Sequence, residues 1–265
     1  KQPYFLKQNK AVLIKNSKKI TLFVEILIIL NIVNFKYLEG ILMFSKKLAD
    51  KLDEYHLLKH PFYQAWNEGK LNREIIKDYA EQYYQHVKAF PRYISATHSL
   101  CDDIEKRKVL LENLQEEEDK DNDHPKLWKQ FALALGADEK EIETKDQDCF
   151  TKDMIDNFFK QARSSYAEGL GSFYTYERQV PEVADVKITG LKLHYEVNTK
   201  EGLQFFEVHK DADVIHRAEC EKLLDELSPE DQKKAERAAL TTAKFMWNFL
   251  SGIALKHKLP LECAA

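Results

Sequence analysis

Helical periodicity runs with few interruptions from Met43 to about residue 256. The sequence of 265 residues contains only 8 Gly and 7 Pro, while 32% of its residues are charged. This composition fits long helices with charged surfaces better than a sandwich or barrel of strands. No segment shows the alternating pattern of a strand of useful length. We therefore predict an all-α fold made of one helical bundle.

Short breaks, most of them marked by proline or glycine, divide this periodic region into segments. Pro91 interrupts one of them after Phe90 and predicts a kink rather than an end. Ser228 followed by Pro229 has the chemistry of a helix start, with Ser as N-cap and Pro at the first helical position. The predicted helices cover 44–57, 61–67, 72–99, 101–118, 124–135, 150–178, 185–195, 200–226 and 229–256.

The first 42 residues differ from the rest of the chain. Ile20–Phe35 is strongly apolar, but it carries Glu25 and is shorter than the ~20 residues that a membrane span requires. A well-formed amphipathic helix begins directly after Met43. We therefore expect an upstream extension at 1–42, one helical domain at 43–256 and a tail at 257–265, with no requirement for a membrane.

Charge and cysteine usage exclude several classes of protein. The formal net charge is −4, and no basic stripe interleaved with aromatic residues is present, so nucleic acid is not expected as a partner. The four cysteines lack C-x-x-C spacing and a short secreted framework, which indicates a cytosolic chain without structural disulfides or zinc.

Three polar residues in the run VHKDADVIHRAE have the spacing of a metal site. His209, Asp213 and His216 stand at i, i+4 and i+7, so on a helix they share one face and can close on one ion. The alternative is an exposed polar stripe on a charged helix. Burial of this face would favour the metal interpretation, because buried polar groups need partners.

Further candidate ligands lie upstream. Glu117 precedes His124 by seven residues within an acidic run, and Glu177 follows aromatic residues in FYTYERQVP. Acidic runs are usually solvated, and a lone Glu often pairs with an Arg. Together, three histidines and three carboxylates suit two Fe or Mn ions that react with O₂. Seven tyrosines are expected around such a site, namely Tyr63, Tyr79, Tyr83, Tyr84, Tyr166, Tyr174 and Tyr176.

Several longer motifs carry a family resemblance. HPFYQAW, DYAEQYYQHVKAFPRYISATHS, LENLQEEEDKDNDHPKLWKQFALALG, YTYERQVP and FEVHKDADVIHRAECE, spread over about 44–250, resemble the chlamydial protein associating with death domains (CADD) and its rickettsial relatives. These belong to the PqqC/TenA-type, heme-oxygenase-like superfamily. The resemblance implies a heme-oxygenase-like bundle of about seven helices and a homodimer. It also implies a bacterial cytoplasmic location, with secretion into a host left open.

The resemblance also implies a chemistry, which is O₂-dependent synthesis of para-aminobenzoate for folate. The metal ligands carry over onto the six residues above, holding two Fe ions or a mixed Fe/Mn pair, with an external reductant. Tyr63 matches a tyrosine that is sacrificed as the source of the ring, and Lys187 matches a proposed amino donor. Tyr176, next to Glu177, is the third residue assigned to catalysis. From the residues alone, Tyr63 is a core aromatic and Lys187 a surface lysine.

Three other functions were weighed against this one. TenA-type thiaminases attack with a cysteine on the helix that here contains SSYAEGLGSFYTYERQ, and this stretch has none. A PqqC-like oxidase acts on an external small molecule without metal, using side chains in a cavity. A protein that binds host death domains would need no converging ligands. Metal content therefore discriminates between these alternatives.

Overall fold

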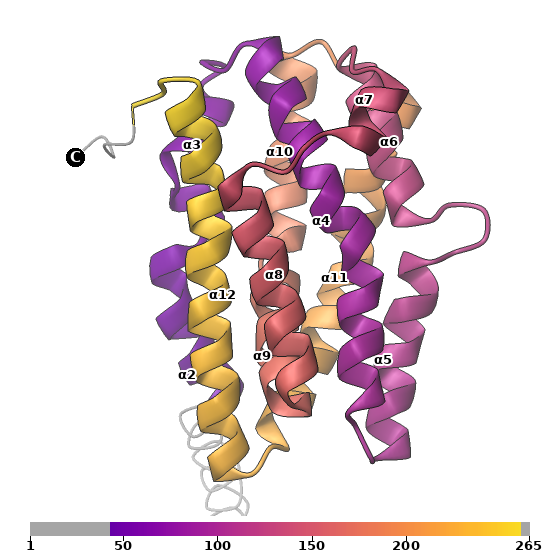
Figure 1. Ribbon diagram of the computed structural model, residues 1–265, viewed down its shortest axis with the longest axis vertical. Helices are drawn as coiled ribbons and strands as arrows, with labels where there is room; N and C mark the ends of the chain where they lie inside the picture. The colour runs from indigo at the N-terminus through magenta and orange to yellow at the C-terminus, as the bar shows by residue number, and fades with distance from the viewer. Residues whose placement is uncertain (1–42, 261–265) are drawn as a thin grey trace, which may run out of the picture. The chain divides into compact units, whose positions relative to one another are not determined.

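The computed structural model describes residues 43–260, and their side chains apart from 211–214. Backbone contacts divide the chain into two compact units, Lys1–Lys47 and Leu48–Ala265. The helices from α3 onward belong to the second unit (Figure 1). The predicted extension at 1–42 and the last residues of the predicted tail, 261–265, lie outside the described residues, and both assignments stay predictions.

All regular structure within 43–260 is helical, which confirms the predicted all-α bundle. This region holds eleven α-helices and two short 3-10 helices, at Asp53–Tyr55 and Leu57–Lys59. The number exceeds the expected seven or so because several helices are short and one predicted helix is divided. The α-helices are α2 (Phe44–Leu52), α3 (Pro61–Asn67), α4 (Arg73–Ser99), α5 (Ile104–Glu117), α6 (His124–Ala134), α7 (Glu139–Thr144), α8 (Cys149–Ser164), α9 (Tyr166–Glu177), α10 (Val180–His194), α11 (Lys200–Asp225) and α12 (Pro229–Lys256).

The helix predicted at 150–178 is two helices, because the chain is extended at Ser165. This residue has φ −159° and ψ 165°, and its hydroxyl accepts a hydrogen bond from the Glu168 amide at 3.2 Å. The same hydroxyl donates to the Glu168 carboxylate at 2.9 Å. Ser followed three residues later by Glu is a capping box, a start signal that the continuous apolar pattern hid.

Other helix ends follow local chemistry. Ser228 accepts from the Asp231 amide at 3.2 Å, which confirms the predicted start of α12. The helix predicted at 185–195 begins earlier, at Val180, because Pro181 fits the first turn of a helix. Pro91 lies inside α4, which continues as a helix to Ser99. The helix predicted at 44–57 ends at Leu52 and is followed by the two 3-10 turns.

Helix α9 lies at the centre of the packing, against α12, α8, α11 and α4. Figure 1 shows α8 and α9 between α12 and α4. Two glycines permit this close approach: a Cβ at Gly171 would stand 2.3 Å from the Ala235 carbonyl oxygen, and one at Gly169 would stand 2.3 Å from Thr97 Oγ1. Because α9 is buried on every side, Tyr176 and Glu177 at its end enter the core.

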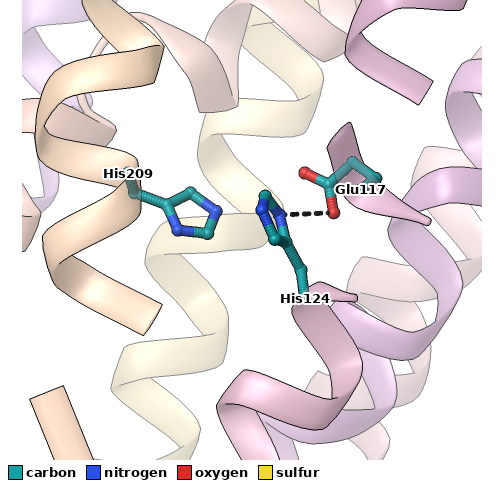
Figure 2. A group of neighbouring side chains, drawn as sticks. All are labelled: Glu117, His124 and His209. Carbon is teal, nitrogen blue, oxygen red and sulfur yellow. Dashed lines mark ion pairs between the residues drawn. The ribbon is translucent and has the colours of Figure 1, made fainter. Parts of the chain in front are cut away.

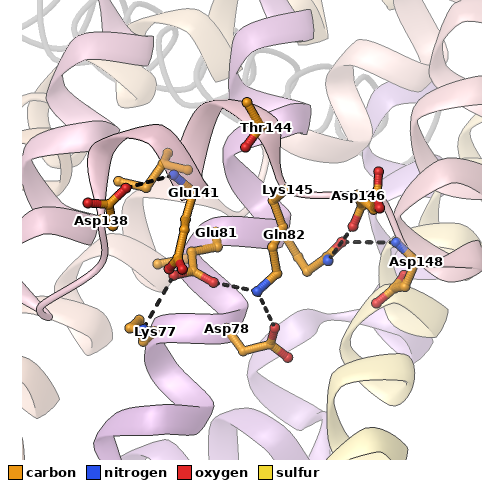
Figure 3. Close-up of polar contacts among 12 residues, drawn as sticks. Lys77, Asp78, Glu81, Gln82, Asp138, Glu141, Thr144, Lys145, Asp146 and Asp148 are labelled. Carbon is orange, nitrogen blue, oxygen red and sulfur yellow. Dashed lines mark hydrogen bonds and ion pairs between the residues drawn. The ribbon is translucent and has the colours of Figure 1, made fainter.

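Buried polar residues hold α4 against the segment between α7 and α8. Glu81, 1% exposed, accepts from Lys145 Nζ at 2.6 Å. Gln82 Nε2 donates to the Asp146 carbonyl at 2.9 Å, and Gln82 Oε1 accepts from the Asp148 amide at 3.2 Å (Figure 3). These contacts fix the rotation of α4 about its axis, which sets the direction of its neighbouring tyrosines.

Within 43–260, no helix combines the length and apolar character that crossing a bilayer demands.

Candidate metal centre

Three of the predicted ligands meet at one point. Glu117, His124 and His209 offer ligand atoms that all lie within 4.8 Å of one another. His124 Nδ1 is 2.9 Å from Glu117 Oε2, and the His124 and His209 ring centroids are 4.3 Å apart. Figure 2 shows the two imidazoles facing each other from separate helices, with the carboxylate beside His124. Such spacing suits ligands that share one ion.

Local capping explains why Glu117 and His124 meet. Glu117 is the last residue of α5 and His124 the first of α6, so a tight loop and not a helix separates them. Asp119 Oδ1 turns this loop by accepting from the amides of Asp121 and Asn122 at 3.0 and 2.8 Å. Asp123 caps α6 by accepting from the Lys126 amide at 2.8 Å. The acidic run that the sequence presents as a solvated stretch therefore builds the turn between two ligands.

The surroundings of His209 favour a neutral imidazole. Its Nδ1–H donates to the Phe205 carbonyl at 2.5 Å, which leaves the Nε2 lone pair for a metal. Burial holds the pKa of His209 well below its usual value, and the positive charges of His124, Lys187 and His216 add to this, while the carbonyl opposes it. Metal binding requires the neutral imidazole, so the buried environment favours the binding form.

A second pair of predicted ligands lies on α9 and α11. His216 Nδ1 is 3.9 Å from Glu177 Oε2, and Glu177 is 2% exposed. His216 Nε2 also contacts Glu116, an exposed residue that the sequence did not single out, at 3.2 Å. Asp213 is on α11 between His209 and His216, but its side chain belongs to 211–214 and lies outside the described part of the structure.

The donor atoms fit a transition metal. Two imidazoles with one carboxylate suit divalent Fe, Mn or Zn. None of the three cysteines within 43–260 takes part in the cluster. The near-complete burial of Glu117 and His209 answers the alternative of an exposed polar stripe, at least for the face of α11 that carries His209.

A small cavity is lined in part by His209. Its volume is about 20 Å³, enough for roughly one water molecule. Its walls include all three residues to which catalytic roles were assigned, as well as one of the metal ligands. These lining residues are Tyr63 on α3, Tyr176 on α9, Lys187 on α10 and His209 on α11, with Tyr83, Phe205 and Phe206 completing the aromatic part of the wall.

Lys187 is buried, so the interpretation as a surface lysine was wrong. Only 5% of the residue is exposed, because it points from α10 towards α11 and α4. Burial lowers the pKa of Lys187 to about 7. Nζ lies 5.1–5.8 Å from the centres of five aromatic rings, which favours the protonated amine and so opposes this effect. The rings are those of Tyr63, Tyr79, Tyr83, Trp128 and Phe206.

Tyr79 connects Lys187 with Tyr63. Lys187 Nζ donates to the Tyr79 hydroxyl at 2.7 Å, and the hydroxyls of Tyr79 and Tyr63 are 3.3 Å apart. Burial raises the pKa of both tyrosines, so both remain phenols at neutral pH. From the sequence, Tyr79 was only one of seven tyrosines expected around the site, although Tyr79, Tyr83 and His86 share one face of α4 at i, i+4 and i+7.

Comparison with known proteins identifies a family. The family described as TENA/THI-4/PQQC matches residues 45–256. A 4-aminobenzoate synthase of Chlamydia pneumoniae is 41% identical over 223 residues, which are 82% of this chain and 97% of the relative. A 4-aminobenzoate synthase of Nitrosomonas europaea is 36% identical over 232 residues, 83% of this chain and 94% of the relative.

A solved structure shows the same fold. A protein of Shewanella denitrificans described as having a heme oxygenase-like fold superimposes with a TM-score of 0.66 at 18% identity, covering 83% of this chain and 94% of that one. The expected heme-oxygenase-like bundle is thereby confirmed.

Proposed function

Because this chain belongs to the TENA/THI-4/PQQC family, we propose that it is a 4-aminobenzoate synthase, a metal-dependent oxygenase that makes para-aminobenzoate for folate synthesis. Relatives with this name match the helical region over nearly their full length, at 36–41% identity. The names belong to those proteins, and the geometry of the cavity supports the same activity here.

One observation carries the proposal. A buried amine with a pKa near 7, a buried phenol and a metal-ligand imidazole line the same cavity, on Lys187, Tyr63 and His209. An amino donor has to present a neutral amine, which an exposed lysine with its ordinary pKa does not do at neutral pH. A ring source has to lie beside the oxidising centre. The shared cavity supports both roles for the chain's own residues and favours them over an external aromatic substrate.

The proposed metal ligands are the six residues that the family resemblance implies; the three that meet in the structure support this assignment, whereas Asp213 rests on the sequence alone. Glu117, His124 and His209 would hold one ion, and Glu177 and His216, together with Asp213, would hold a second. We propose two Fe ions or a mixed Fe/Mn pair, with O₂ and an external reductant as co-substrates. When bound, such a pair supplies the electrons that activate O₂.

The chain's own residues would then determine the product. Tyr63 is the proposed ring source, and Lys187 the proposed source of nitrogen. Tyr176 lines the same wall and is a second phenol within reach of oxidation. Because burial raises the pKa of Tyr63, it would have to lose an electron and a proton together rather than ionise first. A reaction that consumes Tyr63 limits each chain to one molecule of product.

The test uses the full chain loaded with Fe, Mn or both, and supplied with O₂ and reductant but no aromatic compound. We expect 4-aminobenzoate by mass spectrometry, together with loss of the Tyr63 side chain in the peptide map. Tyr63→Phe should give no product. Tyr84→Phe, which removes a buried hydroxyl that bonds to Glu143 and not to Lys187, is the matched control and should still react.

Two outcomes contradict this function. An unmodified Tyr63 alongside many turnovers would indicate a PqqC-like oxidase with an external substrate. Failure of wild type to form product with any metal, together with a metal content near zero, would leave the binding of host death domains as the better hypothesis.

Assembly and location are proposed from the resemblance. We propose a homodimer in the bacterial cytoplasm, which light scattering and cell fractionation would check. Host death-domain proteins are proposed only as additional partners.

A further inference from the structure

Tyr79 stands between the two groups whose atoms are proposed to combine. It comes from α4, whereas Lys187 comes from α10 and Tyr63 from α3. Its oxygen accepts the Lys187 Nζ hydrogen bond at 2.7 Å and lies 3.3 Å from the Tyr63 oxygen. One phenol oxygen therefore holds the nitrogen on one side and the phenol of Tyr63 on the other.

Tyr79 itself is held in place by packing. It is 1% exposed, and its ring stacks on Tyr83 at 5.5 Å and lies 5.2 Å from Phe62 and 5.9 Å from Phe249, measured between ring centroids. Tyr79 is absent from the cavity wall that Tyr63 and Lys187 help to form. Its hydroxyl therefore contacts Lys187 and Tyr63 from outside the cavity wall, and not a molecule in the cavity.

Lys187 depends on this contact for its position. Across residues 43–260, the bond to Tyr79 is the one hydrogen bond that the structure gives to Lys187 Nζ. The other neighbours of Nζ are aromatic rings, which attract a cation without fixing its direction as tightly as a hydrogen bond does. A lysine side chain is a flexible four-carbon stem and loses much conformational freedom when it is ordered. A hydrogen bond to its terminal nitrogen therefore determines where that nitrogen lies.

The product of the proposed function makes this position important. In 4-aminobenzoate, nitrogen is bonded to the ring carbon that carries the hydroxyl in tyrosine. A ring taken from Tyr63 has to exchange a C–O bond for a C–N bond. In the proposed function O₂, with the external reductant, oxidises the ring so that this carbon carries a carbonyl, and the Lys187 amine condenses with it while the oxygen leaves as water. The ring regains its aromatic electrons from the Lys187 Cε–N unit, and water then breaks the Cε–N bond of the resulting imine, which leaves the nitrogen on the ring and an aldehyde on the lysine side chain. Without an amine at that carbon, the excised ring retains its own oxygen and becomes 4-hydroxybenzoate.

We propose, on the basis of that function, that Tyr79 is the positioning residue that makes the product an amine. Its hydroxyl holds Lys187 Nζ beside the phenol end of Tyr63, and no bond to Tyr79 forms or breaks in the reaction. Tyr79 thus selects between aminobenzoate and hydroxybenzoate without contacting the oxidising centre.

The test compares the two products in Tyr79→Phe, which removes the bridging oxygen but keeps the ring that packs against Tyr83 and Phe62. Metal-loaded wild type and variant react with O₂ and reductant, and mass spectrometry measures 4-aminobenzoate, 4-hydroxybenzoate and the fraction of Tyr63 consumed. We expect Tyr63 to be consumed in the variant, with the amino-to-hydroxy ratio falling on the order of ten- to a hundredfold, as for a reactant displaced by about 1 Å.

Tyr84→Phe is the matched control, because it deletes one buried tyrosine hydroxyl from the same helix. Its product ratio should equal that of wild type. An unchanged ratio in Tyr79→Phe would overturn the inference, and so would loss of both products with Tyr63 intact, since Tyr79 would then serve folding or oxidation. Absence of 4-aminobenzoate from wild type would overturn the proposed function first and this inference with it.

Discussion

Replacing the buried amine should stabilise the fold. Lys187→Met keeps the length of the side chain and removes its charge. The difference between an ordinary lysine pKa of 10.5 and about 7 in the folded protein, at about 1.36 kcal/mol per pH unit, corresponds to ~5 kcal/mol of destabilisation while the amine is protonated. Loss of the hydrogen bond to Tyr79 and of the ring contacts offsets about 2 kcal/mol. We expect Lys187→Met to raise the free energy of unfolding by about 3 kcal/mol at pH 6.

The gain in stability from Lys187→Met should decrease as the pH rises. Between pH 7 and 10.5 the unfolded chain holds the Lys187 proton and the folded chain does not, so raising the pH stabilises wild type relative to the variant. The advantage of Lys187→Met should therefore shrink by about 3 kcal/mol between pH 6.5 and 9.5. Other ionising groups are common to both proteins and cancel in the difference.

Urea unfolding followed by circular dichroism, with chelator present so that metal does not contribute, measures this difference at each pH. Lys192→Met removes an exposed lysine from the same helix and should change stability by less than about 0.5 kcal/mol at every pH. A Lys187→Met protein that is less stable than wild type at pH 6, or a difference that does not change with pH, would refute the argument that desolvation controls this amine.

Three further results are expected. His209→Ala should lose at least one of about two metals per chain, measured by plasma mass spectrometry. Replacing the exposed His194 should lose none. Equal metal content in the two variants would contradict the assignment of His209 as a ligand. Gly171→Ala should lower the free energy of unfolding by about 1–3 kcal/mol in thermal or urea denaturation, because the new Cβ meets the α12 backbone at 2.3 Å, and unchanged stability would show that α9 and α12 can separate freely. Lys145→Met should cost about 1–3 kcal/mol by urea unfolding, reduced for partial exposure, because buried Glu81 loses its closest cation. Lys152→Met breaks the exposed ion pair with Asp156 and should leave the free energy of unfolding nearly unchanged. Similar losses of stability in the two lysine variants would contradict the role of burial.

Periodicity was sufficient for the fold but not for every helix end. An apolar stripe recurring at helical spacing identifies a buried face whichever neighbour covers it, so most helices were predicted close to their observed positions. At Ser165 the stripe continues across the break between α8 and α9, and only the capping contacts with Glu168 reveal the end of one helix and the start of the next. The short α7 was missed because its six residues are fewer than periodicity can resolve.

Part of the candidate site was predictable from spacing along one helix, and part of it was not. His209 and His216 belong to one helix, where spacing alone predicts a common face. Glu117 and His124 meet through a loop, and a separation of seven residues across a loop predicts no geometry without the loop's own hydrogen bonds. The contacts of Tyr79 with Tyr63 and Lys187 arise only from the packing of α3, α4 and α10.

The sequence by itself determined the helical class, the motifs of the family and the candidate ligand residues, because these depend on residue type and on spacing along the chain. Tertiary structure alone decided that Lys187 is buried, that it faces Tyr63 through Tyr79, and that these groups share a cavity with His209. The physical reason is that burial, and with it the pKa of an amine, depends on which side chains surround it. Those side chains come from helices far apart in the chain, and no local pattern around Lys187 records them.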